Sequence, residues 1–163
     1  MSTEHEYVSR LVWKGNLGNG TSTYAGYSRE YMVSVDGKPD IRGTADPMFR
    51  GDPALHNPED LFIAAISSCH MLSYLALCAL KGVSVAAYED RATAILALDS
   101  NRNGSFEEVT LNPVVTIADS STEALAIKLH DEAHDLCYIA RSCSVPIHHA
   151  VTIRIAEGGG SQQ

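Results

Sequence analysis

Cys69 is the residue of this chain whose type and position point most directly to chemistry. The 163-residue chain holds four cysteines, at positions 69, 78, 137 and 143, and no Cys-x-x-Cys spacing occurs among them. For an intracellular protein this pattern indicates catalysis or burial and not a disulfide framework. Because the thiolate is the nucleophile, a reactive Cys69 needs a cation nearby to stabilise its charged form. Arg29 and Arg50 lie upstream and could supply it.

The other thiols allow more than one interpretation. Free cysteine is often an unreactive core residue, and this applies to Cys69 and Cys137 as well as to Cys78. Cys143 lies in an expected connecting loop, where it could be a third redox thiol. Exposure and ionisation decide between these alternatives.

Two further kinds of site use histidines. His130, His134 and Cys137 are spaced i, i+4, i+7, so they can share one helix face and could bind zinc. A Cys–His acyl-transfer enzyme would instead use Cys69 as nucleophile and His70 or His134 as base. Adjacent helical residues point about 100° apart, which turns His70 away from its neighbour. His148 and His149 are expected to be polar surface or strand-edge residues.

Residues 57–82 are the helix that must position Cys69. The segment opens on Asn-Pro-Glu-Asp and closes on Lys-Gly, which are typical start and stop signals. No charged residue lies between Asp60 and Lys81, and a helix that is apolar nearly all round lies in a core or a membrane. Its length suits a bilayer span. Its serines, histidine and tyrosine, and the mean hydropathy of −0.07 for the chain, favour the core.

Composition indicates one globular domain over residues 1–163, with flexible ends at about 1–6 and 157–163. Hydrophobic residues make up 45% and charged residues 20%. The net charge of −8 argues against nucleic acid and anionic membranes as partners. No signal peptide is recognisable at the start, so we expect a cytoplasmic protein.

The order of expected elements is βββ-α-ββ-α-β, an α+β fold with helices packed on antiparallel sheet. Strands are predicted over 8–13, 21–29, 31–35, 87–98, 106–117 and 145–155. Asp36-Gly37 signals a hairpin turn. A capping box at residues 120–123 predicts a second helix that ends near 137 or 139.

Two motifs resemble those of the OsmC/Ohr family, the osmotically inducible and organic hydroperoxide resistance proteins. Residues 57–70, Asn-Pro-Glu-Asp-Leu-Phe-Ile-Ala-Ala-Ile-Ser-Ser-Cys-His, are similar to the first motif. Residues 133–142 match the second, Ala-His-x-x-Cys-x-x-Ala-x-Ser. The motif cysteines are 68 residues apart, and the resemblance spans nearly the whole chain. Residues 46–56 look closest to an OsmC-like subgroup.

This resemblance implies an OsmC-like fold, with sheets packed on a long central helix, in an intertwined homodimer with active sites at the interface. It also implies a peroxiredoxin-like organic hydroperoxide reductase that acts against oxidative stress. Cys69 would be the peroxidatic thiolate and Cys137 the resolving partner in a disulfide. Glu59 would orient the activating arginine, either Arg29 or Arg50. The family needs no bound cofactor, only an external dithiol reductant of the lipoyl or thioredoxin type.

The apolar surface of the helix suggests walls for the alkyl part of a hydroperoxide. The side chains expected to form them are Phe62, Ile66, Met71 and Tyr74. Two alternatives stay open. One is a non-catalytic or small-molecule-binding stress protein with the same fold, and the other is a metal-binding protein that uses His130, His134 and Cys137.

Overall fold

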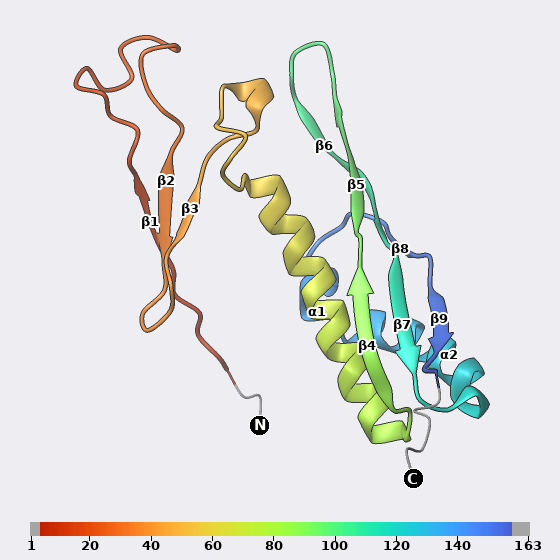
Figure 1. The fold of residues 1–163 in the computed structure, drawn as a ribbon. Helices are drawn as coiled ribbons and strands as arrows, with labels where there is room; N and C mark the ends of the chain where they lie inside the picture. The colour runs from red at the N-terminus through yellow and green to blue at the C-terminus, as the bar shows by residue number, and fades with distance from the viewer. Residues whose placement is uncertain (1–3, 158–163) are drawn as a thin grey trace. The chain divides into compact units, whose positions relative to one another are not determined.

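The structure, a computed structural model, describes residues 4–157, and the chain divides into two compact units (Figure 1). The units are Met1–Phe62 and Ile63–Gln163, and each is described by itself. The ends expected to be flexible lie for the most part outside the described residues. The expected α+β fold is confirmed, with strands before and after a long helix.

The first unit is a small antiparallel sheet of order β1-β2-β3. Its strands are β1 (Arg10–Trp13), β2 (Tyr31–Ser34) and β3 (Ile41–Gly43), followed by the short 3-10 helix η1 (Pro47–Phe49). The predicted turn joins β2 to β3, with Gly37 at a φ of 75°. The strand predicted over 21–29 is wrong, because these residues form turns within a long loop between β1 and β2.

Helix α1 (Pro58–Lys81) confirms the predicted central helix. Its start is a reciprocal cap: the Asp60 N–H donates to Asn57 Oδ1 at 2.8 Å, and the Asn57 N–H donates to Asp60 Oδ2 at 3.2 Å. At its end Gly82 has a φ of 80°, and the Val83 N–H donates to the Cys78 carbonyl at 2.9 Å. Both ends of α1 are therefore set by local sequence.

One stripe of α1 is buried, and not the whole helix as the sequence suggested. The buried residues are Ile66, His70, Tyr74, Leu77 and Cys78. Leu72 is 63% and Leu80 82% exposed on other faces. By length and composition α1 could cross a membrane. Core helices of soluble proteins pass the same test.

The second unit contains two three-stranded sheets. One has the order β4-β7-β9, formed by Val85–Asp90, Pro113–Ile117 and Thr152–Ile155. The other has the order β5-β6-β8, formed by Thr93–Leu98, Gly104–Leu111 and Ile147–His149. The strands β8 and β9 pair parallel to β6 and β7, so the expectation of purely antiparallel sheet is wrong there.

Each long strand predicted after α1 is two strands that belong to different sheets. Residues 87–98 divide between β4 and β5, and residues 106–117 divide between β6 and β7 at Asn112. Asp90 stabilises the break between β6 and β7, because its Oδ1 accepts the Asn112 N–H at 2.7 Å. Its other carboxylate oxygen accepts the hydroxyl hydrogen of Ser67 from α1. A side-chain contact distant in sequence thus sets where the strands end.

The second helical region is three short pieces. They are the 3-10 helix η2 (Ser120–Thr122), α2 (Glu123–Leu136) and α3 (Tyr138–Arg141). The predicted capping box is wrong, since Thr122 makes no side-chain cap bond and Asp119 caps η2 instead. Cys137 ends α2 and accepts the Ala140 N–H at the start of α3.

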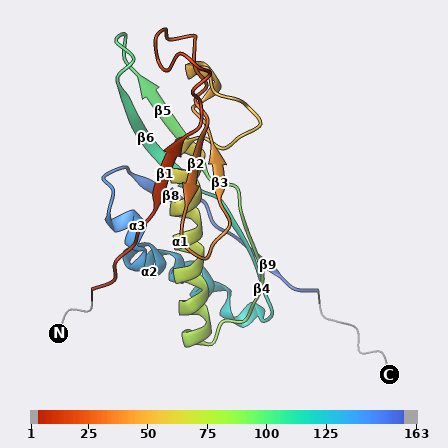
Figure 2. The same cartoon turned by 90° about the vertical axis from the view of Figure 1, so that its left-hand side faces the viewer.

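The core of the second unit lies between α1, β7 and α2, and α2 crosses α1 (Figure 2). Its buried members include Tyr74, Leu77 and Cys78 of α1, Val115 and Ile117 of β7, and Ala126, Leu129 and Ala133 of α2. The Tyr74 hydroxyl donates to the Ala126 carbonyl at 3.1 Å. This bond satisfies the one polar atom that Tyr74 brings into the core.

Leu129→Ala should lower the free energy of unfolding by about 2–5 kcal/mol, because it leaves a cavity where α2 meets α1. Ile127→Ala is the matched control on the same helix, because Ile127 is 49% exposed. Urea denaturation of both variants measures the difference. Equal losses of stability would contradict this position for the core.

Candidate functional site

The structure brings the Cys69 and Cys137 thiols into contact. Their side chains lie close enough to interact directly, although 68 residues separate them in sequence. Cys69 lies midway along α1 and is half-buried, whereas Cys137 lies between α2 and α3 and is fully buried. Packing of α2 against α1 is what places the two sulfurs together.

The two thiols have different surroundings. Burial raises the pKa of Cys137 to about 11, and the interaction with Cys69 adds to this rise. The Ala140 N–H, 3.4 Å from Cys137 Sγ, acts in the opposite direction but does not offset it. At neutral pH Cys137 is therefore a thiol, so it is poorly suited to make the first attack on a substrate.

Arg29, Arg50 and Glu59 all belong to the first unit. Arg29 donates to the carbonyls of Tyr27 and Tyr24, each at 2.6 Å, and its guanidinium lies 4.0 and 4.5 Å from the centroids of those rings. Arg50 is exposed and ends η1 at a φ of 69°. In residues 4–157 Glu59 forms no ion pair with either arginine, and its Oε2 is buried without a hydrogen-bond partner. Its orienting role stays a prediction.

Two of the four side chains expected to line a substrate pocket are core residues. Ile66 and Tyr74 are fully buried within the chain, and Tyr74 is at the centre of the core described above. Both lie on the α1 stripe that the helical period turns inward. Phe62 and Met71 are half-buried, and their place in a substrate pocket stays a prediction.

The alternative of a zinc site from His130, His134 and Cys137 is not supported by the described residues. His130 pairs with His70, the ring of His134 meets that of His149, and Cys137 instead contacts Cys69. Within residues 4–157 no group of three or more His, Cys, Asp or Glu side chains is arranged to hold a metal ion.

The structure also forms a cluster of four histidines that the sequence did not predict. His70 of α1, His130 and His134 of α2, and His149 of β8 meet within the second unit. Burial is the main cause that lowers the pKa of His70 to about 3 and that of His130 to about 4. Only the i, i+4 spacing of His130 and His134 was visible in the sequence. His149 was expected at the surface or at a strand edge, and it lies on the edge strand β8 with its ring turned into the cluster.

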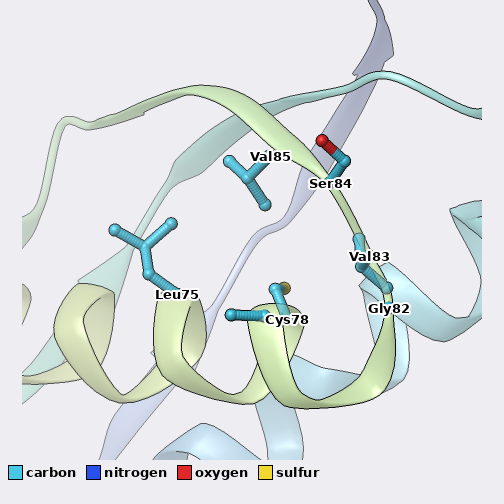
Figure 3. Close-up of a pocket in the computed structure, with 7 residues that line it drawn as sticks. Leu75, Cys78, Gly82, Val83, Ser84 and Val85 are labelled. Atoms are coloured by element: carbon cyan, nitrogen blue, oxygen red, sulfur yellow. The ribbon is translucent and has the colours of Figure 1, made fainter.

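Cys78 lies at the C-terminal end of α1, beside a cleft of about 450 Å³. Leu75 and Val85 face each other across the cleft from α1 and β4 (Figure 3). Cys78 itself is 1% exposed, and burial raises the pKa of its thiol. The prediction that it is a core residue is confirmed.

A family model described as OsmC-like protein matches residues 51–152, well over half of the chain. This chain belongs to the OsmC-like family. The match contains both thiols of the pair and all four clustered histidines. The resemblance inferred from the two cysteine motifs is therefore confirmed.

Solved structures agree with this family and with the OsmC fold. An OsmC-like protein of unknown function from Vibrio cholerae is 32% identical, with a TM-score of 0.79 over 91% of this chain and 99% of its own. An organic hydroperoxide resistance protein from Elizabethkingia anophelis is 18% identical, with a TM-score of 0.63 over 94% and 100%.

The organic hydroperoxide resistance protein OhrB of Bacillus subtilis shares the fold at 20% identity, with a TM-score of 0.56 over 92% of this chain and 98% of its own. Against the curated proteins, the sequence has no significant match.

Alkylation by iodoacetamide at pH 7.5 should modify Cys69 and Cys143 before Cys137 and Cys78. The first two are half-buried, whereas the last two are buried and have raised pKa values. Peptide mass spectrometry over a time course measures the order. Modification of Cys137 ahead of Cys69 would contradict the surroundings described for this pair.

Proposed function

We propose that this OsmC-like protein is a thiol-dependent peroxidase that reduces organic hydroperoxides. The observation that carries the proposal is the contact between Cys69 and Cys137, a pair of thiols from distant segments. Two structural relatives named as organic hydroperoxide resistance proteins support it at the level of the fold. The half-buried Cys69 is the sulfur that a substrate can reach, and the buried Cys137 lies behind it.

In the proposed reaction the Cys69 thiolate attacks the terminal peroxide oxygen. The O–O bond breaks, the alcohol leaves with a proton, and Cys69 becomes a sulfenic acid. The sulfur of Cys137 then attacks the sulfur of Cys69, and the hydroxyl leaves as water with the proton of Cys137. An external dithiol, of the lipoyl or thioredoxin type, reduces the resulting disulfide by exchange.

The Cys69 thiolate needs a cation, for which we propose Arg29 or Arg50, with Glu59 as its orienting carboxylate. A guanidinium can bind a carboxylate as a fork while it faces a thiolate. The buried and unpartnered Oε2 of Glu59 supports this role, because a buried carboxylate oxygen requires a donor. Arg29→Lys and Arg50→Lys, compared for the rate of sulfenic acid formation, would identify the arginine.

We further propose that the protein is a cytoplasmic homodimer. Much of α1 is apolar yet uncovered within one chain, with Leu72 and Leu80 well exposed. A second copy would cover this surface at a gain of about 25 cal/mol per Å² of apolar area. Phe62 and Met71 would then serve as walls for the alkyl group of the substrate. Sedimentation equilibrium without detergent tests the dimer, and a monomer would contradict it.

Cys69→Ser should abolish turnover of cumene hydroperoxide with a dithiol reductant, because the attacking sulfur is lost. Cys137→Ser should consume one equivalent and then stop as a sulfenic acid that dimedone can trap. Stopped-flow kinetics measures both rates, with hydrogen peroxide as the slower substrate.

Cys143→Ser is the control, because Cys143 takes no part in the proposed reaction, and its turnover should match the wild type. Full activity of Cys69→Ser would overturn the assignment. If the wild type leaves both peroxides and its titratable thiols unchanged, the protein is a non-catalytic or ligand-binding member of the family.

A further inference from the structure

We infer that the histidine cluster, made of His70, His130, His134 and His149, is an acid-sensitive positioning element for the thiol pair. While its rings are neutral it holds Cys69 beside Cys137, and when they take up protons it opens and slows disulfide formation. This inference rests on the proposed function for its biological meaning, although the contact that it describes is independent of peroxide chemistry.

The cluster joins the helices that carry the two thiols. His70 Nε2 lies 2.9 Å from His130 Nδ1, so one hydrogen bond connects α1 to α2. His70 follows Cys69 directly in α1, and His134 lies three residues before Cys137 in α2. A change in this contact therefore acts beside Cys69 and about two turns before Cys137, with His134 on the turn between.

The strand β8 completes the cluster. The ring of His149 stacks on that of His70 with centroids 4.6 Å apart, and it meets His134 edge-on at 5.1 Å. Tyr74 stacks on His130, with ring centroids 3.8 Å apart. Three elements are thus held together through imidazole contacts, so the loss of one ring contact weakens the others.

Burial makes protonation of the cluster unfavourable. His70 and His130 are each 1% exposed. Four ring nitrogens are buried without a hydrogen-bond partner in the described structure: His70 Nδ1, His130 Nε2, His134 Nδ1 and His149 Nε2. Protonation of a ring would make both of its nitrogens donors and add a buried charge beside other imidazoles.

Nearby charged and titratable groups do not compensate for that cost. Those that act on the cluster are Asp131 of α2, Asp90 of β4 and His148 of β8. The phenol of Tyr74 stacks on His130, and the ring of Tyr88 contacts that of Tyr74. Asp131 and Asp90 favour protonation, but both side chains lie partly or fully in solvent. Asp90 is also bound to Ser67 and Asn112.

The direction of the pH effect follows from these surroundings. Burial keeps His70 and His130 neutral in the closed cluster until the pH falls to their pKa values of about 3 and about 4. In an opened cluster the same rings take up protons below an ordinary pKa of about 6.5. The closed form is therefore fully favoured above pH 6.5 and loses its advantage progressively as the pH falls towards 4.

The test compares the wild type with the double variant His70→Gln, His130→Asn. The amide of Gln can replace Nε2 of His70, and that of Asn can replace Nδ1 of His130, so the hydrogen bond can be kept by groups that do not titrate. Diamide forms the Cys69–Cys137 disulfide without a peroxide, and non-reducing peptide mass spectrometry follows its rate. The two proteins have the same thiols and meet the same oxidant, so the ratio of their rates at each pH reports the cluster.

At pH 7.5 the two rates should agree, whereas at pH 5 the double variant should be faster by on the order of tenfold. His56→Gln is the control, since the His56 side chain is 73% exposed and belongs to the first unit, outside the cluster, and it should follow the wild type. Equal pH profiles for the wild type and the double variant would overturn the inference.

Two measurements keep the inference testable if the double variant does not fold. The single variant His130→Asn should give a smaller change in the same direction. Imidazole NMR signals of the wild type should show His70 and His130 neutral down to the pH at which the cluster opens, and then protonated together with His149. Independent titration of each ring near pH 6.5 would contradict a closed cluster. Absence of peroxidase activity would overturn only the proposed function.

Discussion

The packing of α2 against one stripe of α1 is the interaction on which the second unit depends. Tyr74 is central to it, because its ring fills the core and its hydroxyl binds the Ala126 carbonyl. One turn before it His70 binds His130, and one residue earlier still Cys69 meets Cys137. Core, histidine cluster and thiol pair are thus successive contacts along one interface between two helices.

The two thiols differ in burial. Cys69 can be reached from outside, whereas Cys137 is enclosed and kept protonated by its surroundings. In the proposed reaction this would protect Cys137 from external oxidants until a sulfenic acid forms at Cys69. Membership of the OsmC-like family and this asymmetry both agree with the order of attack proposed for the reaction.

The histidine cluster lowers the stability of the folded state compared with an apolar core at the same place. Buried nitrogens without partners each lose hydration that nothing replaces, at about 1–3 kcal/mol for each group. Apolar side chains of similar volume would pack there more favourably. The proposed acid response of the thiol pair gives a reason for titratable rings at the interface between α1 and α2.

Local signals in the sequence determined α1, including its cap at Asn57 and its end at Gly82, because such signals act within a few residues. The two cysteine motifs also identified the thiol pair and the family. Only the tertiary structure decided that His149 faces the cluster, that Ile66 and Tyr74 are core and that the long strands divide at Asn112. These features depend on parallel pairing and on contacts such as that between Asp90 and Asn112, which join residues far apart in the chain and leave no periodic trace in it.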